Sequence, residues 1–496
     1  MILELINHHD NSFLIGNQIG LRELEKHVGQ IPQVAKIEWN FGYVTRDKDI
    51  IGLGLCNKNL ESLPECIGNL TSLQILYLND NQLTSLPESI GDLTNLKRLY
   101  LEGNQLTSLP ESIGKLKNLI GLDLGANPLK SLPETIGKLT HLKELYLSTT
   151  MLCSLPKNFN QLTRLNSLNL SLNNFRSLPE NFFQLKNLQV LDLGSNQFKT
   201  LPESLGNLSS LKEFDLYDNQ LISLPENIGK LTNLQKLKLQ NNQLHFLPES
   251  IGELTNLKWL YLEGNQIRSL PPTIGNLKSL QKLYLYDNKL RSLPESVGNL
   301  SNLYQLDLEK NQLKSLPENF HHLTNLRSLN LSLNNFQSLP ANFFQMKKLR
   351  QLCLAGNPLI SFPETINNLK SLKPLKLDLN SWNDVLSLFK LSNSPNHRIR
   401  TKVSEIIKRY ADNTRRSYSI SGMESWEITQ LIQSLLKRGH TLSDDALKWV
   451  FQMFIDLNIP GESLKALKSL LLALLLLNTS SPTLQSLIKK LLADLI

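Results

Sequence analysis

The stretch LQILYLNDNQLTSLP, residues Leu73–Pro87, is the unit from which most of this 496-residue chain is built. Variants of it recur from near residue 50 to near residue 383 at a spacing of 23 residues. Its asparagine returns at Asn81, Asn104, Asn127, Asn173, Asn196, Asn219, Asn242, Asn265, Asn288, Asn311, Asn334, Asn357 and Asn380. Thr150 alone interrupts that series, and the proline keeps the step from Pro64 to Pro363. A period of this length, held without insertions, predicts a stack of similar coils.

Each position of the unit has a physical reason. Leu76 and Leu78 lie two residues apart, which is the period of a strand, so both are expected to point into the core. Ile75, Tyr77 and Asn79 then face the other way, onto a concave surface. In this copy only the variable residues are therefore free to recognise a partner.

The second half of the unit predicts a turn and a return segment. A buried Asn81 side chain satisfies backbone groups that the turn leaves unpaired, and we expect it to bond to the next coil of the stack. Pro87 lacks a donor, which suits an extended return segment and not a central strand. The core floor and the convex side are covered by Leu83, Leu86, Ile90, Leu93 and Leu96, the last three at near-helical spacing.

The repeat form LPxxIGxLxxLxxLxLxxNxL resembles a known 23-residue class of leucine-rich repeats. This class occurs in Ras-binding scaffolds, Ras suppressor proteins, plant Ras-group-related repeat proteins and the repeats of some disease-resistance proteins. The matching framework is Leu76, Leu78, Asn81, Leu83, Leu86, Pro87, Ile90 and Gly91 with their equivalents over residues 50–383. The resemblance implies a concave face that binds folded proteins, with small GTPases and phosphatase complexes among them.

We predict an α/β solenoid: a leucine-rich-repeat horseshoe with a parallel concave sheet of about 15 strands. Residues 1–49 are expected to form an N-terminal cap, with a helix near Gln18 to Val28 and a hairpin whose second strand is the first repeat strand. Residues 50–383 form the solenoid. Residues 384–496 change in composition and predict an all-α helical domain, starting after the break Ser392–Asn396.

A longer period lies over the first one. The sequence SLNLSLNNF at Ser167–Phe175 returns unchanged at Ser328–Phe336, an offset of 161 residues, or seven repeats. Phenylalanine replaces the convex isoleucine at Phe159 and Phe182 and again at the same offset. These rings are expected to be core residues and not a ligand site.

Composition and cysteine usage limit the possible partners and cellular location of the protein. The formal charge of +8 and the pI of about 9.1 are mild for this length and favour solubility over nucleic-acid binding. Four scattered cysteines, Cys56, Cys66, Cys153 and Cys353, form no CxxC pair and no disulfide cap, so a cytoplasmic location is expected. We find no signal peptide, and the apolar run of residues 470–477 is far shorter than a span of about 20 residues. A monomer without membrane contact is expected.

No catalytic or metal motif has its required context. The Gly-Lys pairs at Gly114, Gly137 and Gly229 are followed by leucine and lack the upstream glycine of a phosphate loop. The pairs His8-His9 and His321-His322 have no further ligands at metal spacing. The sequence therefore predicts a non-enzymatic protein without a cofactor or metal.

Aromatic and charged residues gather at the concave positions of neighbouring repeats. The predicted partner-binding residues are Tyr217, Lys236, Lys238, Trp259, Tyr261, Lys282, Tyr284, Tyr286 and Asp287. A secondary partner-binding group is Tyr77, Tyr100 and Tyr146. Tyrosine, tryptophan and flanking charges are typical of protein hot spots, although aromatic residues are also ordinary on an exposed strand face. The preferred hypothesis is a scaffold that captures a folded protein.

Two alternatives stay open. In the first, the C-terminal helices carry an unrecognised enzymatic activity and the repeats select its substrate. In the second, a basic cluster attaches the protein to a membrane surface together with the apolar helix of residues 461–477. The cluster comprises Arg398, Arg400, Lys402, Lys408, Arg409, Arg415 and Arg416, and a solvated helix face explains it as simply.

Overall fold

The computed structural model describes residues 20–37, 40–47, 49–354 and 356–359. The predicted helical domain and its basic cluster lie outside these residues. The chain divides into two compact units, Met1–Gln312 with His322–Leu329, and Leu313–His321 with Asn330–Ile496. The division lies inside the predicted solenoid, and each unit is described by itself.

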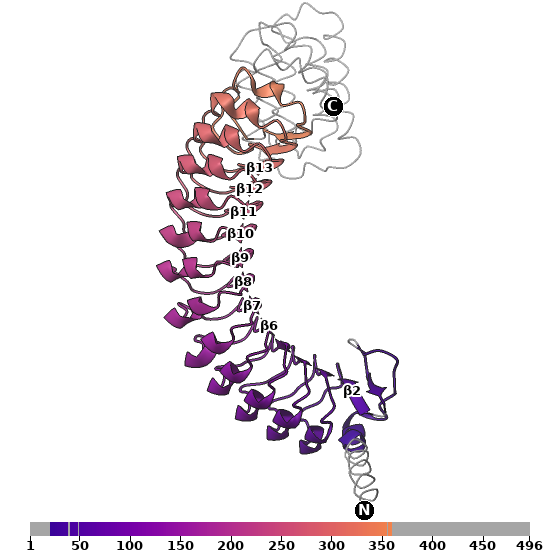
Figure 1. Cartoon of the computed structure of the whole chain (residues 1–496). Coiled ribbons are helices and arrows are strands. Elements are labelled where there is room, and N and C mark those ends of the chain that lie inside the picture. Colours follow the sequence, from indigo (N-terminus) through magenta and orange to yellow (C-terminus); the bar gives the residue numbers. More distant parts are fainter. Residues whose placement is uncertain (1–19, 38–39, 48, 355, 360–496) are drawn as a thin grey trace, which may run out of the picture. The chain divides into compact units, whose positions relative to one another are not determined.

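The strands of the described residues are short and regularly spaced (Figure 1). They are β1 (Gly42–Arg46), β2 (Asp49–Gly54), β3 (Ile75–Tyr77), β4 (Arg98–Tyr100), β5 (Gly121–Asp123), β6 (Glu144–Tyr146), β7 (Ser167–Asn169), β8 (Val190–Asp192), β9 (Glu213–Asp215), β10 (Lys236–Lys238), β11 (Trp259–Tyr261), β12 (Lys282–Tyr284), β13 (Gln305–Asp307), β14 (Ser328–Asn330) and β15 (Gln351–Cys353).

Between the strands the chain forms single turns of 3-10 helix. They are η1 (Glu65–Asn69), η2 (Glu88–Asp92), η3 (Glu111–Lys115), η4 (Glu134–Lys138), η5 (Lys157–Gln161), η6 (Glu180–Gln184), η7 (Glu203–Asn207), η8 (Glu226–Lys230), η9 (Glu249–Glu253), η10 (Pro272–Asn276), η11 (Glu295–Asn299), η12 (Glu318–His322) and η13 (Phe343–Gln345). In the first unit they lie on the side of the coils opposite the strands (Figure 1).

One sheet contains all fifteen described strands, in the order of the sequence. From β2 to β13 the neighbours are parallel and shifted by one repeat, so that Leu76 lies beside Leu99. The predicted number of strands is thus confirmed, but the set differs slightly. β1 is the antiparallel hairpin strand, and the repeat strand expected around Leu375 lies outside the described residues.

The repeat leucines build the core, as the sequence predicts. Leu76 and Leu78 are fully buried, and so are Ile90 and Leu93 on the 3-10 side. Pro87 precedes η2 with extended backbone angles, φ −69° and ψ 153°, because its ring fixes φ and it needs no donor there. The near-helical spacing of the convex residues is thus realised as one tight turn instead of an α-helix.

A column of buried asparagines joins the coils. The Nδ2 of Asn104 donates to the carbonyls of Leu101, in its own coil, and Leu78, in the preceding coil, at 2.9 Å each. Its Oδ1 accepts from the amide of Leu83, also in the preceding coil, at 3.0 Å. The predicted stacking role is confirmed, but the bonds reach backward to the preceding coil and not forward to the next.

The N-terminal residues cover part of the first coils. Residues 20–28 are helical, and β1 and β2 form the predicted antiparallel hairpin. Ile37 lies so close to Gly52 and Gly54 that a Cβ at either glycine would meet it at 2.7–2.8 Å. Ile37 forms a buried cluster with Cys56 and Tyr77.

Two residues of the opening stretch are therefore not on an open surface. Tyr77 is only 8% exposed and Asn79 is buried as well. The expectation that both face the concave surface freely is wrong. For Tyr77 the burial involves Ile37, with Val34 and Val44 packed against the same cluster, and no repeat pattern in the sequence predicts where these N-terminal residues lie.

The phenylalanines that replace convex isoleucines are buried, which confirms their assignment to the core. In the first unit Phe159 and Phe182 stack with ring centroids 6.2 Å apart, and Phe183 meets Phe182 edge-on. In the second unit Phe320 and Phe343 stack at 6.3 Å. The wider rings are accommodated by stacking between coils.

Cys56, Cys66 and Cys153 are free thiols, of which Cys56 is buried and Cys153 is exposed. Within the described part of the chain, no helix is long and apolar enough to span a lipid bilayer.

Candidate interaction surface

The outward residues of the strands form two continuous rows on the face opposite the core. The first row contains Glu213, Lys236, Trp259 and Lys282, because parallel pairing places each beside the next. The second row contains Asp215, Lys238, Tyr261 and Tyr284 in the same way. Neighbouring strands lie about 4.8 Å apart. Side chains of adjacent repeats are therefore in contact distance, and we call this surface, over β9 to β13, the aromatic patch.

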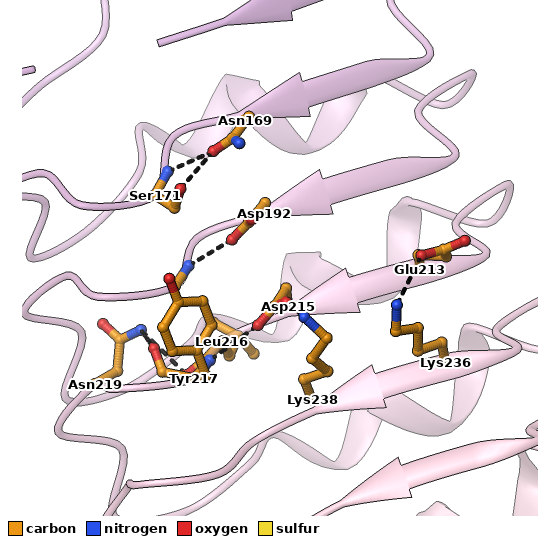
Figure 2. A network of polar contacts seen from close by, with 11 residues as sticks. Asn169, Ser171, Asp192, Glu213, Asp215, Leu216, Tyr217, Asn219, Lys236 and Lys238 are labelled. Atoms are coloured by element: carbon orange, nitrogen blue, oxygen red, sulfur yellow. Dashed lines mark hydrogen bonds and ion pairs between the residues drawn. The ribbon is translucent and has the colours of Figure 1, made fainter. Parts of the chain in front are cut away.

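Lysines and carboxylates pair across β9 and β10. Lys236 Nζ lies 3.4 Å from a carboxylate oxygen of Glu213, and Lys238 forms an ion pair with Asp215. Figure 2 shows both lysines reaching from β10 to the carboxylates of β9. The charges of this part of the patch are thus neutralised before any partner arrives.

The acidic residues at the strand ends also close the turn that follows. Asp192 Oδ1 accepts from the amide of Gly194 at 2.9 Å, and Asp215 Oδ1 accepts from that of Tyr217 at 3.2 Å. Asn169 does the same for Ser171 at 2.8 Å, which extends the network to β7 (Figure 2). A short side chain with an acceptor oxygen suits this turn.

Burial and pairing shift the ionisation of this network. Burial raises the pKa of Asp192, while the bond from Gly194 acts in the opposite direction. For Lys238 burial favours the neutral amine, but the hydrogen bond and charge of Asp215 outweigh it, so its pKa is raised. At neutral pH Lys238 is charged and held in place by its partner.

Aromatic rings follow directly on the paired lysines. Tyr261 and Tyr284 stack with centroids 5.0 Å apart and planes 8° from parallel. Lys236 Nζ lies 6.0 Å from the centroid of the Trp259 ring. Burial, with the neighbouring Tyr261 adding to it, raises the pKa of Tyr284 to about 12, so this hydroxyl remains protonated. Two stacked, half-buried tyrosine rings therefore form the centre of the patch.

Cations lie over rings at the edges of the patch as well. Lys238 is 5.7 Å from the Tyr217 centroid, and Lys282 is 5.8 Å from that of Tyr304. Lys310 is 5.9 Å from the Tyr286 centroid and pairs with Asp287 at 2.7 Å. Such contacts orient both the cation and the ring.

Three polar atoms beside the rings have no hydrogen-bond partner among the described residues: Trp259 Nε1, Glu263 Oε2 and Gln240 Oε1. Burial raises the pKa of Glu263 to about 7, and the nearby charge of Asp307 adds to it. A buried polar atom without a partner raises the energy of the free protein.

The structure therefore brings together the predicted partner-binding residues from Tyr217 to Asp287 on neighbouring strands. Sequence reasoning missed Tyr304 and Lys310 as part of the patch. Tyr304 lies one position before β13, outside the outward positions of the strand. Its place in the patch is seen only from the contact of its ring with Lys282. The raised pKa of Glu263 depends on burial that the sequence does not encode.

The secondary group is divided. Tyr100 stacks on the buried Tyr77 at 4.6 Å, so these two rings belong partly to the N-terminal cluster. Arg98 reaches over Gly121 to Glu144 at 3.0 Å, and the missing side chain of the glycine leaves room for this bridge across two repeats. Tyr146 lies on β6, separated from the aromatic patch by β7 and β8.

Among the residues that the structure describes, no group of three or more His, Cys, Asp or Glu side chains is placed to hold a metal ion.

Comparison with known proteins identifies the repeat. The family model described as "Leucine-rich repeat region" matches residues 52–124, 133–220, 157–241, 203–303 and 294–393. No curated protein matches the chain.

Among solved structures, a leucine-rich repeat protein of Leptospira interrogans is 40% identical, with a TM-score of 0.61 over 65% of this chain and 88% of that one. The plant peptide hormone receptor RGFR1 in complex with RGF2 is 30% identical with a TM-score of 0.53, covering 65% of this chain and 58% of the receptor. The TLR13–ssRNA13 complex is 29% identical with a TM-score of 0.54, covering 65% and 54%. This chain thus spans little more than half the length of the two receptors.

Proposed function

Because the chain belongs to the leucine-rich repeat family, we propose that it is a non-catalytic interaction protein that binds a folded protein on its aromatic patch. Proteins of this fold typically mediate protein–protein interaction, and the family match indicates no catalytic family. The proposal concerns the site and its occupant. Tyr261 and Tyr284, stacked and flanked by paired charges, are the observation that carries it.

Three properties of the patch support a protein partner. Its rings present apolar area with little conformational freedom to lose, which is typical of hot-spot residues. Lys236 and Lys238 are already paired with Glu213 and Asp215, so a partner does not have to neutralise these two charges. Trp259 Nε1 and Glu263 Oε2 are unpaired, so a partner that supplies hydrogen bonds after local side-chain rearrangement gains binding energy.

The repeat class suggests the partner and the setting. Its resemblance to Ras-binding scaffolds and Ras suppressor proteins favours a small GTPase or another signalling protein as the occupant, with this chain as a cytoplasmic scaffold in signal transduction. The acidic residues among the rings argue against nucleic acid. The alternative of an enzymatic activity in residues 384–496 concerns residues that the structure does not describe.

Substitution of Trp259 and Tyr284 by alanine tests the proposal. Affinity capture with the full-length protein first identifies the partner. The Kd of the complex between the protein and the purified partner is then measured by calorimetry. Each substitution is expected to weaken binding by roughly 30-fold, the effect of a hot spot of about 2 kcal/mol. Tyr146→Ala, a tyrosine of the same row on β6, is the matched control and is expected to leave the Kd unchanged.

A Kd that is unchanged in the Trp259→Ala, Tyr284→Ala protein, with an intact circular dichroism spectrum, contradicts the proposal. An equal loss in Tyr146→Ala contradicts the assignment to β9–β13, because binding then extends over the face as a whole.

A further inference from the structure

Four large apolar side chains of the first unit are exposed on the loops that lead from the strands to the 3-10 helices. Phe246 is 53% exposed, Met151 51%, Leu172 49% and Ile222 47%. None of them is on the aromatic patch. Exposed apolar residues of this size that gather on one side of a molecule indicate an interaction surface.

Each of these residues occupies a position that other repeats fill with a polar residue. Phe246 corresponds to Ser85 and Ser223, and Met151 corresponds to Gln82. The remaining two replacements are of the same kind: Ile222 stands at the position of Thr84, and Leu172 at that of Asp80 and Asp218. The coil does not require an apolar side chain at any of these positions.

Leu172 has the backbone conformation of the equivalent residues in other repeats. Its φ is +56°, in the left-handed region, where the equivalent Asp80, Asp218 and Asn241 also lie. Asparagine and aspartate tolerate this conformation, whereas a leucine there is unfavourable. The coil imposes this conformation at other residue types as well, among them Thr149, Ser195 and Lys310, so what is particular to Leu172 is its exposed apolar side chain.

The same loops carry cations. We define the basic flank as the positions equivalent to Gln82, Thr84 and Ser85 in every repeat from residue 82 to residue 292. Its cations are Lys130, Arg176, Lys199, Arg268, Lys289 and Arg291, and all six are exposed. Residues 82–292 are described without a gap, and none of these positions holds an aspartate or glutamate.

Backbone hydrogen bonds place successive residues of the flank side by side. The amide of Ile222 donates to the carbonyl of Lys199 at 3.3 Å, and the amide of Arg291 donates to that of Arg268 at 3.4 Å. Arg268 in turn donates to the residue before Phe246, His245, at 3.3 Å. With a strand spacing of about 4.8 Å, the five steps from Arg176 to Arg291 span roughly 24 Å.

Carboxylates lie on both sides of the flank, and several are engaged. On the 3-10 side, Glu203 accepts from the amides of Glu226 and Asn227 at 3.3 and 2.9 Å. On the strand side, Asp287 pairs with Lys310. Glu203 and Asp287, the carboxylates named here on either side of the flank, are therefore already bonded to groups other than the cations of the flank.

We propose that the basic flank docks onto an anionic lipid membrane. Cations attract the acidic head groups, while Phe246, Ile222 and Met151 of the flank enter the boundary between head groups and acyl chains. A single-stranded nucleic acid fits less well, since it stacks its bases on a series of aromatic platforms, and the flank offers only Phe246 and His245. The sequence predicts no membrane contact because it does not reveal which loop residues are exposed together.

Vesicle sedimentation with the full-length protein tests this. Binding is compared on phosphatidylcholine vesicles with and without phosphatidylserine, at low and high salt. We expect binding only with phosphatidylserine, and weaker binding at high salt. The variant Phe246→Ser, Ile222→Thr restores residues found at these positions in other repeats, so it folds, and it is expected to lower binding about tenfold or more.

A charge variant and its matched control separate the flank from other basic parts of the chain. Lys199→Gln, Arg268→Gln, Arg291→Gln is expected to lose about fivefold in binding per cation. Lys138→Gln, Lys186→Gln, Lys230→Gln removes the same charge from exposed positions on or next to the 3-10 helices and is expected to bind as the wild type does.

The proposal is overturned if wild-type protein does not sediment with acidic vesicles, or sediments equally with neutral ones. It is also overturned if both triple variants lose binding equally, or if the protein binds a single-stranded oligonucleotide through these loops and no vesicle. These substitutions leave the aromatic patch unchanged. The vesicle experiment can therefore contradict membrane docking without affecting the proposal that a protein partner binds the aromatic patch.

Discussion

Thr150 is the residue at which the asparagine column of the described coils is interrupted. Its hydroxyl lies within hydrogen-bond distance of Asn173 Oδ1 and of the Leu147 carbonyl, but it has a single proton. The Leu129 amide bonds to the carbonyl of Asn127 at 2.8 Å, where the equivalent Leu106 bonds to an asparagine Oδ1. One threonine thus replaces an amide that serves several backbone groups elsewhere.

We predict that Thr150→Asn raises the free energy of unfolding by about 1–2 kcal/mol, because it adds roughly two buried hydrogen bonds. Urea denaturation at constant m-value measures this change. Thr150→Ser keeps the hydroxyl and serves as the control, with little expected change. A Thr150→Asn protein that is less stable than the wild type would show that the coil has adapted to the threonine.

Glu263 makes stability depend on pH. Burial raises its pKa from an ordinary value of 4.5 to about 7. Between these values the folded protein holds a proton that the unfolded chain has released, so stability falls as the pH rises through this range. In Glu263→Gln this contribution is absent.

We therefore expect wild-type protein to lose stability relative to Glu263→Gln when the pH is raised from about 4.5 to 7. Urea denaturation of both proteins at several pH values measures the difference. Parallel stability curves for the two proteins would contradict the raised pKa.

At the scale of the element, the 3-10 helices are tied to one another by glutamates. Glu134 of η4 accepts from the amides of Lys157 and Asn158, the first residues of η5, at 3.2 and 3.3 Å. Glu88 of η2 accepts in the same way from Ser112 of η3 at 3.3 Å. A carboxylate suits the unpaired amides at the start of a helical turn, which explains why this position of the repeat is so often glutamate.

The hairpin β1–β2 is the element that ends the sheet on the N-terminal side. Ile37 packs against Tyr77 and Cys56 beside it. Without this contact an unpaired strand edge and apolar area would face solvent, which favours association between molecules. We propose that the segment acts as a cap.

We predict that Ile37→Asp loosens this cap. A charge in the cluster is unfavourable, so the amides of β1 and the first half of β2 are expected to exchange with deuterium faster by about tenfold or more, while those of β5 to β13 remain unchanged. Hydrogen-exchange mass spectrometry measures this peptide by peptide. Unchanged exchange in residues 42–54 would show that Ile37 does not hold the hairpin.

At the scale of the whole molecule, the period of the sequence predicts the fold because every coil repeats the same physical solution. The core leucines, the asparagine column and the parallel register all follow from a spacing of 23 residues. The 3-10 turns are harder to predict from the sequence, because the spacing of Ile90 and Leu93 is also found in an α-helix.

The sequence predicts which strand residues lie near one another in the aromatic patch, but it does not predict their burial or ionisation, and it does not reveal Tyr304 and Lys310. The repeat register places Trp259, Tyr261 and Tyr284 on one face, so their neighbourhood can be read from the sequence. The burial of Tyr77 depends on a non-repeating segment, and the raised pKa of Glu263 depends on its surroundings. Non-repeating contacts of this kind have no period to predict them.

The backward direction of the asparagine bonds has a consequence for synthesis. Asn104 fastens its own coil to the coil before it, and so do the equivalent asparagines of the described coils, such as Asn127 and Asn357. A chain that leaves the ribosome N-terminus first therefore brings, with each new coil, the amide that attaches it to the coil already formed. At about 5–20 residues per second a coil is completed every few seconds. The molecule is thus suited to vectorial, co-translational folding, in which the step at Thr150 lacks the asparagine bonds and depends on the backbone pairing of β5 with β6.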